Sequence, residues 1–146
     1  MAKKKVRRTK SRTRPYQIFL SHSTSDKWLA KVLCEKIEAT GATTFRDDRD
    51  ICGGDDIPEG IRIQIKQSKE VVVLLTPQSI GRLWVILEVG AAWGWSRRIR
   101  ILPIMYHVSV DTIPDIIKNK KAIPLNDFDQ YAKDLTERVR EYHGRK

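Results

Sequence analysis

The chain has 146 residues, of which 40% are hydrophobic and 32% are charged, a length and composition that fit one globular domain with its own core. No apolar run approaches the roughly 20 residues that span a bilayer, so no membrane span is predicted. The formal net charge is +10, which favours a polyanionic partner only if the folded part carries that charge.

The first 14 residues carry most of the charge. They hold eight basic and no acidic residues, which leaves 20 basic residues against 18 acidic ones in the remainder. A basic run without apolar periodicity is typical of a disordered tail, so we divide the chain into a tail (1–14) and a folded domain (15–146). Nucleic acid or an acidic surface is the alternative partner, and it would bind through the tail alone. The tail has no apolar signal-peptide segment.

The first half of the domain is predicted to form a strand, a helix and a second strand. Residues 16–20 are mostly apolar and β-prone, and in the polar cluster that follows, Ser23 or Thr24 is placed to cap a helix. Apolar residues then recur at helical spacing as far as Gly41, a candidate C′ glycine, and 42–46 form the second strand. The apolar residues expected on one face of this helix are Trp28, Leu29, Val32, Leu33 and Ile37.

The second half alternates in the same way. Pro58 suits the first turn of a helix that carries Ile61 and Ile65. Residues 71–75 are continuously apolar, which is typical of a strand buried on both faces of a parallel sheet. The remaining elements are predicted as helices at 83–95, 112–118 and 127–142, and as strands at 99–105 and 122–125. These last two strands contain proline, which favours places toward the outside of the sheet.

Repeated alternation of strands and helices with short connections predicts right-handed βαβ units. The fold class is therefore α/β: a flavodoxin-like, three-layer domain with a five-stranded parallel sheet and helices on both faces. In such folds the site lies at the carboxyl ends of the strands, where the strand order reverses. That rule points to the loops after Leu20, Arg46, Leu75 and Met105.

Glu88 is the one acidic residue of the apolar helix at 83–95. Trp84 precedes it by four residues and so lies on the same helix face, one turn away. A carboxylate in apolar surroundings is costly unless it is paired or has a chemical task. Two interpretations stay open at this point: a surface or paired glutamate, for example with Arg82, and a functional carboxylate.

Two loops are further candidates. The acidic loop at 47–56 is either solvated or mobile enough to gate a site, since Gly53 and Gly54 permit unusual backbone angles. His22 and the hydroxyls around it follow the first strand, where they either form a cap and turn or bind a phosphate or act as a base. No glycine-rich dinucleotide or P-loop motif is present.

No metal site is predicted, because Cys34 and Cys52 have no Cys or His at ligand spacing. So few cysteines are typical of a reducing compartment, and a cytoplasmic location is expected. His107 and His143 are single histidines near element ends and are expected at the surface.

Three motifs, in order, resemble Toll/interleukin-1 receptor (TIR) domains. The run 16–23 followed by Asp26 resembles the first TIR box, and 46–55 resembles the segment that forms the BB loop in that family. Trp84 with Glu88 resembles the W-x-x-x-E motif of its NAD-cleaving members. The likeness extends over residues 15 to about 142. The loop has Cys52 before its two glycines, where receptor-type members often carry proline, and this difference favours an enzyme over a receptor-type adaptor.

The resemblance implies an NAD⁺ glycohydrolase or ADP-ribosyl cyclase in a bacterial, anti-phage defence pathway. It implies Glu88 as the catalytic residue and NAD⁺ as the substrate, with no cofactor. Residues implied at the substrate are Phe19, Ser21, His22, Trp84 and Asp50. Residues implied in self-association through TIR–TIR contacts are Ile51, Cys52, Gly53, Gly54 and Asp55. A separate effector or sensor protein is the expected partner.

Two other functions remain open under the same resemblance. One is a non-enzymatic adaptor that acts through TIR–TIR contacts, and the other is a host-directed virulence factor. The product, either ADP-ribose or a cyclic isomer, depends on how far water is excluded from the site, which the sequence does not determine.

Overall fold

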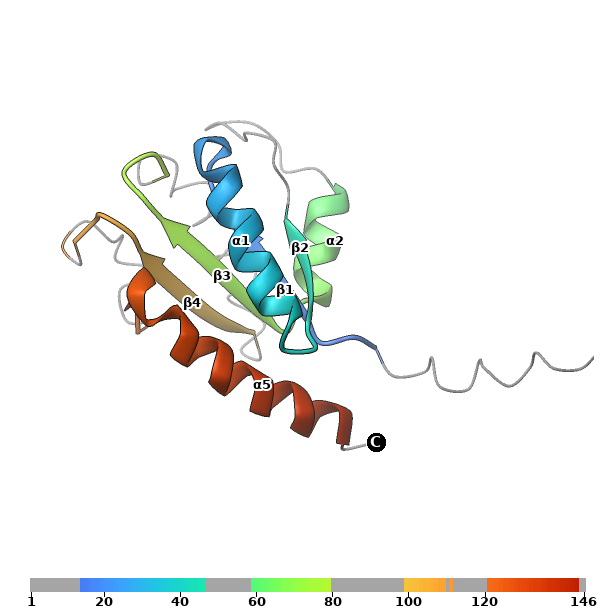
Figure 1. The fold of residues 1–146 in the computed structure, drawn as a ribbon. Coiled ribbons are helices and arrows are strands. Elements are labelled where there is room, and N and C mark those ends of the chain that lie inside the picture. The colour runs from blue at the N-terminus through green and yellow to red at the C-terminus, as the bar shows by residue number, and fades with distance from the viewer. Residues whose placement is uncertain (1–13, 47–58, 80–98, 110, 112–120, 145–146) are drawn as a thin grey trace, which may run out of the picture.

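The computed structural model describes residues 14–46, 59–79, 99–109, 111 and 121–144. Its strands form one parallel sheet in the order β2-β1-β3-β4-β5, of which Figure 1 labels the first four. The strands are β1 (Gln17–Ser21), β2 (Thr43–Arg46), β3 (Glu70–Leu75), β4 (Arg100–Met105) and β5 (Ile123–Pro124). This is the flavodoxin-like strand order, so the predicted sheet is confirmed.

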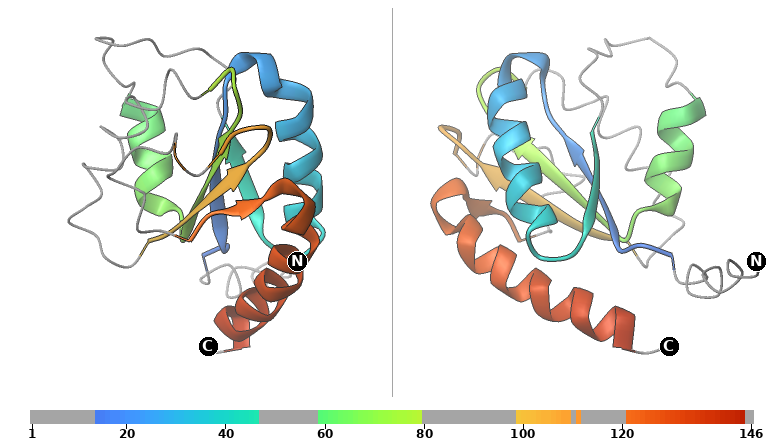
Figure 2. Two further views of the ribbon diagram at one scale, coloured as in Figure 1. Left: turned by 90° about the vertical axis from the view of Figure 1, so that its left-hand side faces the viewer. Right: turned by 45° about the vertical axis from the view of Figure 1, so that its right-hand side comes forward.

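Helices cover both faces of the sheet. The described helices are α1 (Lys27–Glu38), α2 (Glu59–Gln67) and α5 (Phe128–Gly144), with 3₁₀ turns η2 (Thr24–Asp26) and η5 (Leu125–Asp127). Figure 2 shows α1 and α5 on one face and α2 on the other, which gives the predicted three layers. The helices predicted at 83–95 and 112–118 lie outside the described residues. No described helix has the length and hydropathy of a membrane span.

The core has two parts, one on each side of the sheet. Ile18 and Leu20 pack with α1 and α5, while Phe19, the residue between them, packs with Ile61 and Ile65 of α2. This is the alternation that a strand between two helical layers requires. All of β3 is buried, so the prediction that 71–75 is covered on both faces is confirmed.

The predicted buried face of the first helix was wrong at Trp28, which is 75% exposed. The residues that α1 buries are Ala30, Leu33, Cys34 and Ile37, which follow the spacing i, i+3, i+4 and i+7. Trp28 precedes Ala30 by two residues, which turns it by about 200° around the helix axis, away from the sheet.

The ends of α1 also differ in detail from the prediction. Ser23 precedes η2, but its hydroxyl makes no cap to the backbone and instead donates to the Asp26 carboxylate. Gly41 has φ of +102°, a conformation that favours glycine. It stands two residues beyond the C-cap, Ala39, and therefore one residue later than the predicted C′ position.

The two proline-containing strands lie on the side of the sheet away from β2. β5 is the edge strand, whereas β4 lies one position further in, between β3 and β5. β4 accommodates Pro103 because β5 pairs only with Ile104 and Met105. Among the described residues, the outer side of β4 therefore carries no strand partner at Pro103 itself.

Candidate active site

The candidate site lies where the strand order reverses. From β1, the chain adds β2 on one side and β3 and β4 on the other, so the carboxyl ends of β1 and β3 flank the reversal point. Ser21, the last residue of β1, pairs with Val73, and β3 then continues to Leu75. Ligands of open α/β sheets bind outside these strand ends.

A hydrogen-bonded network joins the two loops that leave these strands. The Asp26 Oδ2 atom accepts a hydrogen bond from the Ser23 hydroxyl at 2.8 Å and a second from the Thr76 hydroxyl at 2.5 Å. Ser23 and Thr76 are both buried. The carboxylate thus ties the segment after β1 to the segment after β3.

The end of β3 is closed by a reciprocal turn. The Thr76 backbone N–H donates to Ser79 Oγ at 2.8 Å, and the Ser79 N–H donates back to Thr76 Oγ1 at 3.2 Å. Ser79 Oγ donates in turn to the Leu74 carbonyl at 2.9 Å. Each hydroxyl therefore both donates and accepts, which leaves the Thr76 hydroxyl in a fixed orientation toward Asp26.

His22 is half-buried beside this network. Its Nδ1 atom lies 2.7 Å from the Ser23 carbonyl oxygen. A carbonyl only accepts hydrogen bonds, so Nδ1 carries the proton, and in the neutral ring Nε2 is the acceptor nitrogen. Nε2 is itself buried, so the ring packs against the protein at the border of the candidate site and does not extend into solvent.

The structure brings some of the expected site residues together. Ser21 and His22 stand at the carboxyl edge, next to the network. Phe19 lies deeper in β1, is 6% exposed and packs its ring 5.6 Å from that of Phe45. Its contact with substrate stays a prediction. The other expected residues, Trp84, Glu88, Asp50, Ile51, Cys52, Gly53, Gly54 and Asp55, lie outside the described residues.

The sequence analysis did not predict the hydrogen bonds that Thr76 and Ser79 make at the end of β3. The signal available was a threonine directly after a fully apolar strand, followed by proline and, three residues on, by serine. Hydroxyl residues in that position often bond to nearby backbone groups. Nothing in the pattern indicated that the threonine would reach Asp26, which lies 50 residues earlier.

A second polar cluster, which the sequence did not predict either, lies at the amino-terminal ends of the strands. Glu70, the first residue of β3, is fully buried. Its carboxylate accepts hydrogen bonds from the hydroxyls of Tyr16 at 2.5 Å and Tyr131 at 2.7 Å. The Arg138 guanidinium donates to both carboxylate oxygens, from Nε at 2.7 Å and Nη2 at 3.2 Å. We call Glu70, Tyr16, Tyr131 and Arg138 the Glu70 cluster.

The ionisation of the Glu70 cluster reflects its burial. Burial raises the pKa of Tyr16 to about 12, with help from its hydrogen bond to the charged Glu70. Burial and the charge of Glu70 likewise raise the pKa of Tyr131. For Arg138, burial lowers the pKa, but the bonds to Glu70 outweigh it and raise the value. Both phenols therefore stay protonated, and Arg138 stays charged, near pH 7.

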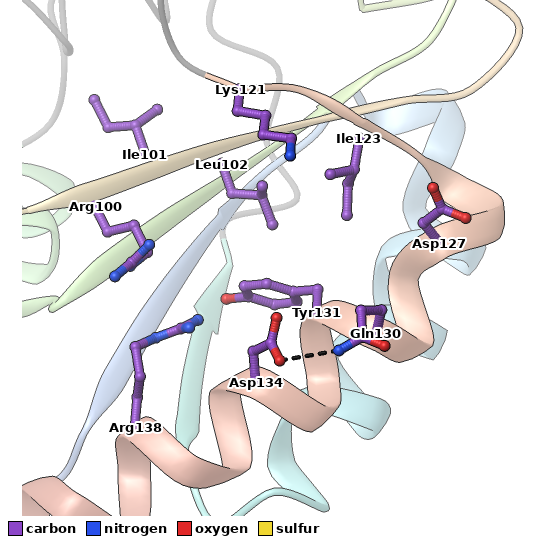
Figure 3. Close-up of a pocket in the computed structure, with 10 residues that line it drawn as sticks. All are labelled: Arg100, Ile101, Leu102, Lys121, Ile123, Asp127, Gln130, Tyr131, Asp134 and Arg138. Carbon is purple, nitrogen blue, oxygen red and sulfur yellow. Dashed lines mark hydrogen bonds between the residues drawn. The ribbon is translucent and has the colours of Figure 1, made fainter.

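A hollow of about 800 Å³ lies beside this cluster, between β4, β5 and α5. Figure 3 shows Arg138 and Tyr131 of the cluster on one side and Lys121 on the other. On the α5 side of the hollow, Gln130 Nε2 donates a hydrogen bond to Asp134 Oδ1 at 3.0 Å. Of the expected site residues that the structure describes, neither Phe19 nor Ser21 nor His22 lines the hollow. Within the described parts of the chain, no group of His, Cys, Asp and Glu side chains is arranged to hold a metal ion.

Comparison with known proteins identifies relatives of this chain. The family model described as TIR domain matches residues 18–139. A curated protein of Paracoccus denitrificans, NAD(+) hydrolase PdTIR, is 30% identical over 102 residues, which are 68% of this chain and 34% of that protein. The chain thus spans about a third of the length of the curated relative that it matches.

Solved TIR structures share the fold. A TIR–STING receptor from C. gigas, in complex with 2′,3′-cGAMP, has a TM-score of 0.62 at 23% identity and covers 84% of this chain and 38% of its own. The TIR domain of the Toll-related receptor TRR-2 from Hydra magnipapillata has a TM-score of 0.61 at 21% identity, and the match covers 87% of this chain and 99% of that one. The TIR domains of the activated Roq1 resistosome have a TM-score of 0.51 at 18% identity, and the match covers 86% of this chain and 84% of that one.

Proposed function

Because this chain belongs to the TIR domain family, we propose that it cleaves the bond between nicotinamide and ribose in NAD⁺. The observation that carries the proposal is the position of Ser21 and His22. They belong to the motif that resembles the first TIR box, and they stand where the strand order reverses. The 30% identity to a relative named as an NAD(+) hydrolase supports the same reaction.

Glu88 is the proposed catalytic residue. In the reaction, the bond between ribose C1′ and the nicotinamide nitrogen breaks, and the nitrogen keeps the electron pair. Nicotinamide therefore leaves as a neutral molecule, and no general acid is needed. The ribose develops oxocarbenium character, which a carboxylate in apolar surroundings stabilises electrostatically. Glu88 suits this task because the residues around it in the sequence are apolar.

The group that attacks C1′ determines the product. Attack by water gives ADP-ribose and releases a proton to solvent. Attack by the adenine or by a ribose oxygen of the same substrate gives a cyclic isomer, which requires that water be kept out of the site. We include both products in the proposal.

We place the activity in a bacterial defence pathway, where the product would act on a separate effector protein. Assembly through the loop from Asp50 to Asp55 is part of the proposal. The Roq1 structure, which contains the TIR domains of an activated resistosome, supports self-association as a property to test here.

The test is nicotinamide release from NAD⁺ by the concentrated full chain, with and without a crowding agent, with the products identified by liquid chromatography and mass spectrometry. Glu88→Gln and Glu88→Ala are compared with Glu137→Gln, a matched change at an exposed residue of α5. We expect the Glu88 variants to lose activity by about 10²-fold or more and Glu137→Gln to retain it.

Circular dichroism shows whether each variant is folded. Equal release by folded Glu88→Ala and wild type would rule out Glu88 as the catalytic residue. No release by wild type, combined with binding of a TIR partner that Glu88→Ala retains, would favour the adaptor or virulence function instead.

A further inference from the structure

The Asp26 carboxylate links the loops after β1 and β3 through side chains. Both of its bonds run to Oδ2, one from Ser23 and one from Thr76. Thr76 lies 50 residues further along the chain. A bond over this separation fixes the relative position of two loops whose described residues are not joined by ladder hydrogen bonds beyond the strand ends.

Ser23 is held at two points by Asp26. The Ser23 hydroxyl donates to the Asp26 carboxylate at 2.8 Å, and the Asp26 backbone N–H donates to the Ser23 carbonyl at 3.0 Å. The same carbonyl accepts the Nδ1–H of His22 at 2.7 Å. The orientation of the His22 ring therefore depends on a carbonyl whose place is set by Asp26.

We propose that Asp26 is a positioning residue of this site, which acts through Ser23 to hold His22 with its proton on Nδ1 and through Thr76 to hold the two loops together. The contribution to catalysis rests on the proposed NAD⁺-cleaving function, whereas the positioning itself does not. Asp26 is not a catalytic residue in this proposal, because its carboxylate is engaged by two hydroxyls.

The expected kinetic effect follows from this role. A misplaced site edge disturbs the reacting geometry more than it weakens overall binding, and a displacement of about 1 Å costs up to about 10²-fold in rate. We expect Asp26→Ala to lower kcat for NAD⁺ cleavage by about 10- to 100-fold, with a change in KM of less than about threefold.

A spectroscopic readout tests the positioning without reference to activity. The chain has three histidines, so long-range ¹H–¹⁵N spectra of the labelled full chain at about pH 8.5, where imidazoles are neutral, resolve few rings. His22→Gln identifies the His22 signals. We expect Nδ1–H in the wild type, a mixture of the two tautomers in Asp26→Ala, and a smaller shift toward that mixture in Thr76→Val.

Two further variants complete the test. Thr76→Ser keeps the hydroxyl and should restore the wild-type spectrum, whereas Asp129→Ala removes an exposed carboxylate of α5 and should change neither spectrum nor rate. If Asp26→Ala does not fold, the contrast between Thr76→Val and Thr76→Ser decides the proposal. An Nε2–H tautomer in the wild type, or an unchanged His22 spectrum in folded Asp26→Ala, would overturn it.

The two proposals fail in different ways. If the wild type releases no nicotinamide while the His22 spectra change as expected, the proposed function is wrong and the positioning by Asp26 stands. If the wild type is active and Asp26→Ala keeps both the kcat and the His22 spectrum of the wild type, the positioning is wrong and the proposed function stands.

Discussion

Two carboxylates at opposite ends of the strands of one sheet are bound in different ways. Glu70, at the amino edge, is fully buried and receives bonds from two phenols and an arginine. Asp26, at the carboxyl edge, is half-buried and receives bonds from two hydroxyls, with no cation paired to it within the described residues. A fully buried charge needs full compensation, whereas a partly solvated one does not.

The groups that the two carboxylates join also differ. Glu70 connects β3 to α5 and to the start of β1, all of which are packed elements, so its bonds contribute to the stability of the domain. Asp26 connects two loops at the end where open α/β sheets bind ligands. The comparison separates a cluster that joins packed elements at the amino-terminal ends of the strands from a network that, in our proposal, positions a candidate site at their carboxyl ends.

The largest expected effect is at Glu70. Glu70→Ala leaves the Arg138 guanidinium and two phenols without their shared acceptor, and should lower the free energy of unfolding by about 3–5 kcal/mol. Urea unfolding at pH 7 measures the difference. The matched control is Glu137→Ala, whose carboxylate is paired with Arg140 at the surface and should cost less than about 1 kcal/mol. Similar costs for both variants would contradict the role given to the Glu70 cluster.

A somewhat smaller loss is expected at Arg138. Arg138→Met removes the guanidinium, but the two phenols remain bonded to Glu70 and the Arg100 Nε lies 3.9 Å from its Oε2. The expected cost is about 3 kcal/mol, measured in the same way. Arg140→Met, two residues later and exposed, should be almost neutral. A neutral Arg138→Met would mean that the phenols alone satisfy the buried charge.

Tyr16 gives a prediction that depends on pH. Its pKa is raised to about 12 in the fold from about 10 in the unfolded chain, so the protonated phenol stabilises the folded state. That stability is complete below about pH 10 and is lost as the pH rises through about 12. Tyr16→Phe should therefore cost about 1–2 kcal/mol at pH 7.

Unfolding measured from pH 7 to 11.5 tests this linkage. The difference in stability between wild type and Tyr16→Phe should narrow as the pH rises above about 10, because only the wild type has this phenol to ionise. A difference that stays constant over that range would show that the Tyr16 phenol is not held protonated by its surroundings.

The smallest effect on stability is expected at the carboxyl edge. Thr76→Val removes one donor to a half-buried carboxylate and the long acceptor contact of the Ser79 N–H, and should still cost only about 1 kcal/mol in unfolding experiments. Thr76→Ser, which keeps the hydroxyl, should recover most of the stability that Thr76→Val loses. A cost as large as that of Glu70→Ala would show that both edges contribute equally to stability, and the contrast between them would disappear.

The fold was predictable because its signals are local. The uniformly apolar run at 71–75 and the helical spacing in 28–37 indicate a buried strand and a helix without knowledge of the partners. The exposure of Trp28 was not predictable in this way. Which stripe of α1 meets the sheet depends on where the helix starts, and Trp28 lies only one residue beyond that start.

The polar clusters were missed because their partners are far apart in the chain. Glu70 meets Tyr16 over 54 residues and Arg138 over 68 residues. A glutamate before an apolar strand resembles an ordinary solvent-exposed flank. The carboxyl-edge location of Ser21 and His22 was predicted, because it follows from strand order alone. The roles of Glu88 and of the loop at 50–55 stay predictions, since those residues lie outside the described parts.

The most direct test of the division between the two edges is the rate of NAD⁺ cleavage per folded molecule in Glu70→Gln and Asp26→Ala, at a temperature where both are folded. We predict that Glu70→Gln keeps the wild-type rate despite lower stability, and that Asp26→Ala loses about 10- to 100-fold despite a smaller loss of stability. The opposite pattern, with a slow Glu70→Gln and a fully active Asp26→Ala, would contradict the account.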